Sequence, residues 1–202
     1  MNAAAHINEV YSKNGKIWNL KMDGWWVGGH LPAPNLSQGY HAIQQQWWEE
    51  YATGNNVLLV SETKKVKRTF ESIYKHWSIL AIDRFTELTD ASSDGCDIVG
   101  DICEVPSPLA GYKFDLIINQ ATLEHVYNPF GAMKNLVDSL NRGGIIISHT
   151  HPPAMVYHSF PRDYFRFMKD WWYDLPQWLP GIELLELAMI DNLHVFTCFR
   201  KI

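Results

Sequence analysis

The stretch FDLIINQATLEHVYNPFGAMKNLVDSLNRGGIIISH, residues 114–149, decides the fold. Its first and last segments, FDLIIN and IIISH, are unbroken apolar runs, as in strands covered on both faces of a sheet. Between them, Asn128-Pro129 favours a helix start, because proline fits the first helical turn, and apolar residues then recur on one face. A strand, a helix and a strand in this order predict two parallel strands joined by a crossover helix.

The same alternation extends over residues 55–202, where Thr63 is a second candidate helix cap. The two closing strands are expected to pair antiparallel because a short link joins them. We therefore predict an α/β fold, a Rossmann-like doubly wound, mostly parallel seven-stranded sheet with an antiparallel last strand and helices on both faces. The expected strands are 57–60, 78–83, 96–101, 114–119, 145–149, 182–190 and 194–200.

Two helix ends are also predicted. Residues 141–144, Asn-Arg-Gly-Gly, are expected to end the helix that starts after Asn128. A later helix is expected over residues 164–175, with apolar side chains at helical spacing, and Pro176 should stop it.

Residues 1–54 form a separate N-terminal part that could cover the main domain of residues 55–202. Residues 1–13 are polar and expected to be loosely ordered. Residues 15–29 are typical of a hairpin with an Asp-Gly turn, and a helix capped by Ser37 follows. Tryptophan pairs occur at 25–26, 47–48 and 171–172, and we expect them to be exposed if this chain is a binding partner rather than an enzyme.

Length and composition limit the class of protein. The chain has 202 residues and a net charge of -5, from 17 basic and 22 acidic residues, which disfavours nucleic-acid binding. Three cysteines make a disulfide framework improbable and favour a reducing compartment. The N-terminus does not resemble a secretory signal, and no apolar stretch is long enough for a membrane span. We therefore expect a cytoplasmic protein that binds no membrane, whose oligomeric state stays open.

Polar residues follow the successive predicted strands, where ligands bind in open α/β sheets. Each of these residues taken alone is better explained as a solvated loop residue or a helix cap. Together, at four successive strand ends, they favour a binding site. They are Asp83, Asp101, Asn119, Gln120, His149 and His151.

The segments GDICEVP, FDLII, LEHVYNP and RGG before an apolar strand resemble the central half of a class I S-adenosylmethionine-dependent methyltransferase. PRDYFRF, residues 161–167, further resembles a subgroup with a Pro-x-Asp-Tyr-x-Arg-Phe segment. The resemblance covers roughly residues 55–202 and implies S-adenosyl-L-methionine as cofactor. It assigns the ribose to Asp83, the adenine to Asp101 and Ile102, and the methionine end to Asn119 and Gln120.

The glycine motif of that family is degenerate here. Where the family has an acid and two or three glycines, this chain has Ser61-Glu62-Thr63-Lys64-Lys65, whose side chains would obstruct close backbone approach. Either the helix starts later or lies further out, so that Ser61 and Glu62 meet the cofactor with their side chains, or cofactor binding is lost. Glu62 could contact the ammonium of the methionine moiety. The basic residues at the helix start are better explained as a solvated face than as an anion site.

His149, His151, His158 and Asp163 fall within fifteen residues. His151 and His158 are the candidate general bases of an acceptor pocket. A zinc or iron site on these histidines is a weaker alternative, because Pro152-Pro153 interrupts the segment, so no metal site is predicted.

The predicted function is therefore an S-adenosylmethionine-dependent methyltransferase with a small-molecule or sugar-type acceptor. The alternative is a non-catalytic binding or partner protein that keeps this fold and has lost cofactor binding.

Overall fold

The computed structural model describes residues 7–12, 41–84, 95–159, 162–190 and 193–202. The expected hairpin at 15–29 and the Ser37 cap lie outside these residues. The described strands form one sheet in the order β1-β7-β8-β6-β5-β2-β3-β4. Their bounds are β1 Ile7–Ser12, β2 Asn56–Val60, β3 Ser78–Asp83, β4 Ile98–Val99, β5 Phe114–Gln120, β6 Leu140–Thr150, β7 Ile182–Ile190 and β8 His194–Lys201.

The strand directions confirm the predicted doubly wound sheet. β2 pairs in parallel with β3 and β5, β3 with β4, and β5 with β6, whereas β8 pairs antiparallel with β6 and β7. β1 adds an eighth strand, antiparallel to β7, inside the 1–13 stretch for which we predicted loose order. That prediction was wrong because β7 offers unpaired backbone groups at the sheet edge, and pairing with them orders a segment of weak intrinsic preference.

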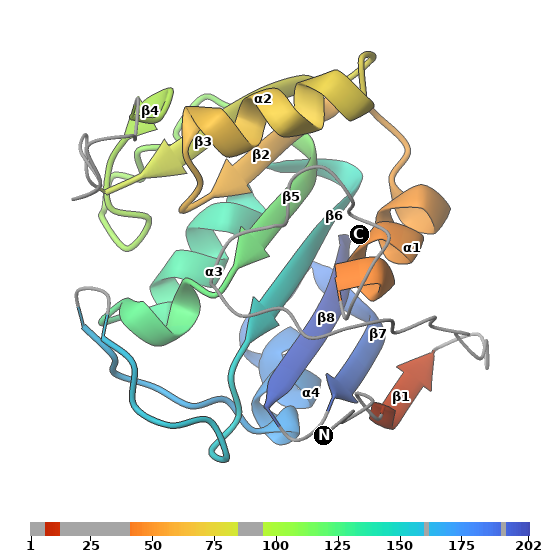
Figure 1. The fold of residues 1–202 in the computed structure, drawn as a ribbon, viewed down its shortest axis with the longest axis vertical. Coiled ribbons are helices and arrows are strands. Elements are labelled where there is room, and N and C mark those ends of the chain that lie inside the picture. Colours follow the sequence, from red (N-terminus) through yellow and green to blue (C-terminus); the bar gives the residue numbers. More distant parts are fainter. Residues whose placement is uncertain (1–6, 13–40, 85–94, 160–161, 191–192) are drawn as a thin grey trace, which may run out of the picture.

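Helices cover both faces of the sheet, with α1 and α2 in front and α3 and α4 behind (Figure 1). One core cluster, with Trp47 and Phe70, lies under α1 and α2, and the other, with Met133 and Trp172, lies under α3 and α4. No described helix is long and apolar enough to cross a membrane. The helices are α1 His41–Tyr51, α2 Lys64–Ile73, the short 3-10 helix η1 Leu123–His125, α3 Pro129–Asp138 and α4 Lys169–Trp178.

Both predicted helix caps are confirmed. The Thr63 side chain accepts a hydrogen bond from the Val66 amide, 3.3 Å away, and α2 begins at the next residue. The Asn128 side chain accepts from the Gly131 amide at 3.0 Å, and Pro129 occupies the first turn of α3. Each cap satisfies an amide that would otherwise lack a partner in the first turn.

Both predicted helix ends were wrong. α3 ends at Asp138, and β6 begins at Leu140, so that residues 141–144 belong to the strand. α4 begins only at Lys169 and contains Pro176 instead of stopping before it. The apolar spacing over 164–168 is not helical because backbone contacts compete: the Tyr164 and Phe165 amides donate to the Glu124 carbonyl, and Phe167 donates to that of His151.

The third strand is also shorter than predicted. β4 spans only Ile98–Val99, although the Asp97 and Gly100 amides extend the contact by donating to carbonyls of β3. The Asp97 side chain replaces a further backbone acceptor, since its Oδ2 accepts from the Ala81 amide at 2.8 Å.

In the tryptophan pairs at 47–48 and 171–172, three members are buried and Trp171 is partly buried, whereas Trp178, outside these pairs, is 69% exposed. Trp47, Trp48 and Trp172 are at most 2% exposed. Trp48 packs edge-on against Phe70, with ring centroids 5.9 Å apart, and thereby fixes α1 against α2. These tryptophans are core residues and offer no surface to a partner, so the exposure expected under the binding-protein alternative is wrong for them; the pair at 25–26 lies outside the described residues.

Candidate functional site

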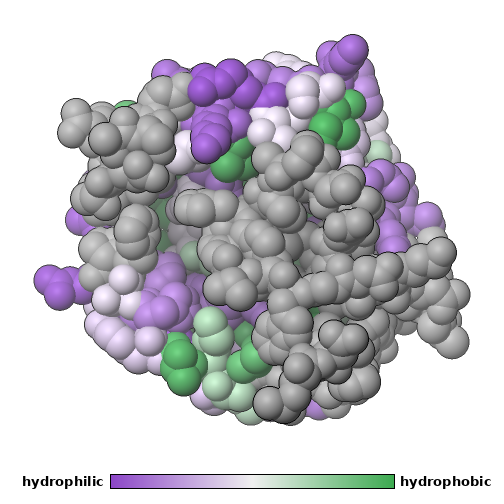
Figure 2. All heavy atoms as spheres, in the orientation of Figure 1, coloured by the Kyte–Doolittle hydropathy of each residue, from purple (hydrophilic) through white to green (hydrophobic). Residues whose placement is uncertain are grey.

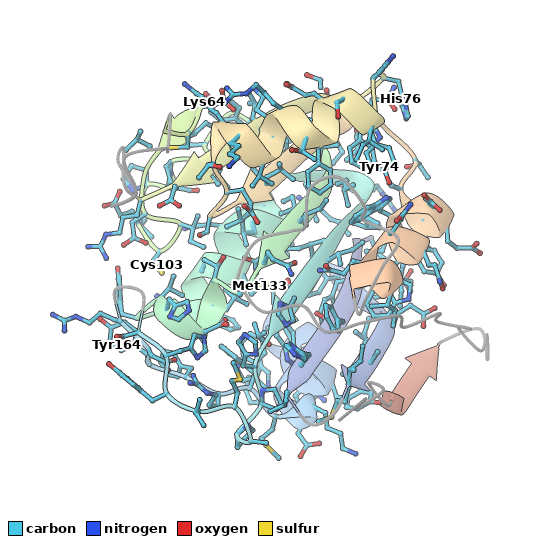
Figure 3. All side chains as sticks on the ribbon, in the orientation of Figure 1. Lys64, Tyr74, His76, Cys103, Met133 and Tyr164 are labelled. Carbon is cyan, nitrogen blue, oxygen red and sulfur yellow. The ribbon has the colours of Figure 1, made fainter. Side chains whose placement is uncertain are left out.

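The residues predicted to bind a cofactor lie at the carboxyl ends of four neighbouring strands, in the sheet order β5-β2-β3-β4. Parallel strands bring these ends to the same edge of the sheet. Figure 3 labels Lys64 at the start of α2 on the side where β2 and β3 end, and Tyr74 and His76 beyond its other end. The chain therefore directs the loops after these strands to one edge.

The turn between β2 and α2 compensates for the missing glycines in its backbone. Ser61 has a φ of 58°, a left-handed conformation that glycine adopts freely and other residues adopt at a cost. The Ser61 amide donates to the Ile82 carbonyl at 2.8 Å, which holds the turn against β3. Because α2 starts at Lys64, the turn is short and the helix does not start later; the other option, a helix that lies further out, stays a prediction.

The basic residues of α2 form a solvated face. The Lys67 ammonium lies 3.1 Å from an Asp97 carboxylate oxygen and 3.6 Å from one of Glu71. Figure 2 shows hydrophilic residues gathered over α2. The explanation of the basic cluster as a surface helix therefore accounts for these contacts without a bound anion.

Glu62 is the most unusual residue of the turn. Its side chain is only 1% exposed, and its Oε2 has no hydrogen-bond partner among the described residues. Burial first, and the charge of Asp83 second, raise the pKa of this carboxyl to about 8. A buried acid without a partner fits a cationic ligand group such as an ammonium, which would supply the missing charge.

Asp83 and Asp101 stand after neighbouring strands. Asp83 ends β3 and is half-buried, near enough to Glu62 to affect its pKa. Asp101 is 8% exposed: one carboxylate oxygen accepts from the Cys103 amide at 2.9 Å, and the other lies 3.5 Å from Arg84 Nε. Ile102 is buried beside it, and its carbonyl accepts from Asn135 at 2.8 Å. Asp101 is thus held in place by its own loop.

Asn119 and Gln120, at the end of β5, diverge. Successive strand residues point to opposite faces. Asn119 donates to Ser148 Oγ at 3.3 Å, and its own Oδ1 is buried without a hydrogen-bond partner. Gln120 accepts from Gln44 of α1 at 2.9 Å and contacts His149 Nδ1 at 3.2 Å. Of the pair, Asn119 keeps an acceptor available for a ligand, while Gln120 joins the sheet to α1.

The histidine predictions fall on the neighbouring strand end, after β6. His151 is 6% exposed, and its Nδ1 contacts the Leu193 carbonyl at 2.8 Å. Its Nε2 lies 3.5 Å from Oε1 of Glu124, a fully buried carboxylate in η1. Burial, opposed by that backbone hydrogen bond, lowers the pKa of His151 to about 4, so the ring is neutral near pH 7.

His158 packs edge-on against His151, with ring centroids 5.0 Å apart. The segment is tied down by Asp163, whose carboxylate accepts from the His158 amide at 2.7 Å and pairs with the Arg166 guanidinium. That guanidinium, as the larger cause, lowers the pKa of Asp163 to about 2. Asp163 lies ahead of α4, which begins at Lys169, and its carboxylate is held by the ion pair with Arg166.

His149 belongs to β6, and its ring takes part in a different set of contacts. Its Nδ1 faces the Gln120 amide, and its Nε2 lies 2.9 Å from His194 Nδ1 on β8. His125, in η1, donates from Nδ1 to the Arg162 carbonyl at 2.5 Å.

Sequence reasoning did not single out Glu124, Gln44 or His194. Glu124 had a usable signal, a lone acid between a strand end and a helix cap, flanked by Leu123 and His125. Gln44 and His194 had none, because each is significant only through contacts with residues 76 and 45 positions away.

Comparison with known proteins shows which proteins this chain resembles. Residues 63–148 match the family model described as a methyltransferase domain. A search of curated proteins finds no match. A methyltransferase from Clostridium acetobutylicum, described as S-adenosylmethionine-dependent, superposes with a TM-score of 0.56 at 10% identity, covering 79% of this chain and 89% of that one. This chain therefore has the fold of S-adenosylmethionine-dependent methyltransferases.

Two other methyltransferase structures have the same fold, with a comparable TM-score and sequence identity. A TehB-like methyltransferase from Corynebacterium glutamicum has a TM-score of 0.56 at 14% identity over 83% of this chain and 93% of its own. The N-terminal domain of EvdMO1, solved with SAH bound, has a TM-score of 0.56 at 12% identity over 80% of each chain. In this chain the match to the methyltransferase-domain model starts at Thr63, which leaves β2 and the Ser61-Glu62 turn outside it.

Proposed function

We propose that this protein is an S-adenosyl-L-methionine-dependent methyltransferase that acts on a small-molecule or sugar-type acceptor. The observation that carries the proposal is the buried carboxyl of Glu62, which lacks a partner for Oε2 and stands beside Asp83 at the adjoining ends of β2 and β3. The match of residues 63–148 to a methyltransferase-domain model supports the same conclusion.

The chain's residues have distinct roles in this proposal. Asp83 accepts hydrogen bonds from the ribose, Asp101 and Ile102 hold the adenine, and Ser61, Glu62, Asn119 and Gln120 surround the methionine end. The unpartnered Glu62 Oε2 and Asn119 Oδ1 are acceptors that suit the ammonium of that moiety. The bound cofactor supplies an activated methyl group, so the protein's task is to align the acceptor and exclude water.

His151 and His158 are the proposed bases that take a proton from the acceptor. The Leu193 carbonyl keeps the His151 proton on Nδ1, so Nε2 carries the lone pair that a base requires. The low pKa of His151 makes it a weak base that is unprotonated at neutral pH.

The proposed acceptor class rests on the small molecules present with two structures of similar fold. The N-terminal domain of EvdMO1 was crystallised in the presence of D-fucose, and an O-methyltransferase family 2 protein from Planctomyces limnophilus was solved in complex with apigenin. Because D-fucose and apigenin both carry hydroxyl groups, these two structures support a sugar-type or other small hydroxyl-bearing acceptor for this chain.

Calorimetric titration with S-adenosylhomocysteine tests the proposal. We expect one molecule bound per chain. Absence of binding heat at millimolar ligand, in protein shown to be folded by circular dichroism, would reject the assignment. The control variant is His76→Asn, which lies beyond the far end of α2 (Figure 3). Asn135→Ala does not serve as a control, because the Asn135 side chain donates to the Ile102 carbonyl and holds that loop.

A further inference from the structure

We propose that Glu124, His151 and His158 bind one divalent transition-metal ion. One potential ligand atom from each residue lies within 4.8 Å of the other two. Two histidines and a carboxylate are a common ligand set for zinc and for non-haem iron, and such sites leave coordination positions open.

Glu124 provides the main argument. Its side chain is completely buried, and neither carboxylate oxygen accepts a hydrogen bond from another described residue. Burial raises the pKa of this carboxyl to about 8, although its own backbone amide and the charge of Arg166 lower it in part. Ionising a buried carboxyl is costly, and a bound cation would offset that cost by supplying a compensating charge.

His151 faces Glu124 at a distance that suits two ligands of one ion. Because Nδ1 donates to the Leu193 carbonyl, Nε2 holds a lone pair, and it lies 3.5 Å from Glu124 Oε1. Two electron-rich atoms at this separation are too far apart for a good hydrogen bond. The separation matches two ligands on one tetrahedral zinc, for which bonds of about 2.0–2.1 Å place the ligand atoms about 3.3–3.5 Å apart.

The hydrogen bond from His151 Nδ1 to a backbone carbonyl is also typical of a histidine that binds a metal. Histidines that bind metals usually donate their other ring N–H to a carbonyl or carboxylate, which fixes the tautomer. The Leu193 carbonyl serves His151 in this way. His158 Nδ1 lies 3.1 Å from the Val156 carbonyl and 3.3 Å from Arg166 Nη2, so only the tautomer that donates to Val156 leaves Nε2 of His158 as a ligand atom.

The nearby Arg166 does not prevent a cation from binding. Its guanidinium donates to both carboxylate oxygens of Asp163, so its charge is already paired. The same pair holds the segment that carries His158, since Asp163 also accepts from the His158 amide.

A neighbouring set, His149, His151 and His194, is also close enough to bind an ion. It is the poorer candidate because His149 has partners for both ring nitrogens: Gln120 donates to Nδ1, and Nε2 lies 2.9 Å from His194 Nδ1. These contacts form a complete hydrogen-bonded chain without a metal.

A catalytic role for the ion rests on the proposed function, whereas the binding of the ion does not. In a methyltransferase, an acceptor hydroxyl in an open coordination position would lose its proton more readily, because the metal stabilises the resulting oxyanion. His151 and His158 would then act by holding the ion.

The test is titration of chelator-treated full-length protein with Zn²⁺, followed by calorimetry, and with Co²⁺, followed by visible absorption. We expect one ion per chain, a Co²⁺ absorption of four or five coordination, and a Kd of micromolar or below. Glu124→Gln and His158→Ala should each weaken Zn²⁺ binding at least tenfold. His194→Asn and the distant His76→Asn should leave it within twofold.

No cofactor or acceptor is present in this titration, so a failure here is separate from a failure to bind S-adenosylhomocysteine. Melting curves establish that each variant is folded, and His158→Ala is the safer variant because its side chain is 33% exposed. Absence of Zn²⁺ heat and of a Co²⁺ band in folded wild type would overturn the proposal. So would binding that is lost in His194→Asn but kept in Glu124→Gln, since the ion would then occupy the other histidine set.

Discussion

Glu62 makes the affinity of this protein for its cofactor depend on pH in a calculable way. In the ligand-free protein the pKa of Glu62 is about 8, so the carboxyl is mostly protonated at pH 7. If it binds the ammonium of S-adenosylhomocysteine, it must ionise, and each unit of pKa change corresponds to about 1.36 kcal/mol. Ionising a group of pKa 8 at pH 7 therefore costs about 1.4 kcal/mol, a tenfold loss of affinity that disappears above pH 8.

The expected result is a rise in affinity of about twentyfold between pH 6.0 and 7.5, with nearly one proton released per ligand bound. Calorimetry in buffers of different ionisation enthalpy measures both quantities. Glu62→Gln should bind more weakly at pH 7.5 and show neither the slope nor the proton release. The window stays below the pH at which the ligand's own amino group loses its charge.

A ligand without the ammonium supplies the matched control. Methylthioadenosine keeps the adenosyl part, so its affinity should vary little with pH in wild type and change little in Glu62→Gln. Wild-type binding of S-adenosylhomocysteine that is flat from pH 6.0 to 7.5 and releases no proton would refute the placement of Glu62 against the ammonium. An equal pH slope for both ligands would refute it as well, because the linked group would then lie at the adenosine end.

Three further outcomes are expected. Asp83→Ala should weaken S-adenosylhomocysteine binding by about 1.5–3 kcal/mol through loss of a charged hydrogen bond to the ribose, and an unchanged Kd would contradict that contact. Ser61→Gly should raise the free energy of unfolding by about 0.5–1 kcal/mol, because φ at Ser61 is 58° and the relief of strain in the folded state exceeds the entropy that glycine adds to the unfolded chain. Ser61→Ala, measured alongside by urea denaturation, should bring no such gain. Glu62 should contribute a fall of about 2 kcal/mol in the unfolding free energy of the ligand-free protein from pH 6 to 8, because a carboxyl whose folded pKa of about 8 exceeds its ordinary 4.5 stabilises the fold fully below pH 4.5 and progressively less as pH rises through 8. Glu124, whose pKa is also about 8, should add a fall of similar size in wild type, and Glu62→Gln should lack only the share of Glu62.

The sequence predicted the sheet well because its signals are local and strong. The runs at 57–60 and 114–119 are apolar throughout, as strands buried on both faces require, and they are β2 and β5. The Thr63 and Asn128 caps were predictable because each acts on an amide three residues away.

The errors arise where distant contacts decide the structure. The helical spacing over 164–168 is overridden by amides that donate to the Glu124 and His151 carbonyls, and the pairing of β1 depends on β7, more than 170 residues later. Site prediction has the same limit. Asp83 and Asp101 were found from their positions after strands, but the significance of Glu124 depends on its burial and on facing His151, neither of which a pattern of residue types contains.

The two buried acids, Glu62 and Glu124, follow the ends of two neighbouring strands, β2 and β5. β2 and β5 are neighbours, and the residue directly after each strand, Ser61 and Ala121, is left-handed, with φ of 58° and 44°. Left-handed residues other than glycine are costly, and such strain tends to persist where a site requires it. Each strained residue precedes a buried acid with an unpartnered oxygen, Glu62 after Ser61 and Glu124 after Ala121. The chain thus places a left-handed residue ahead of a buried acid at both strand ends, which is the arrangement expected if the first acid binds the cofactor's ammonium and the second binds a cation beside the acceptor.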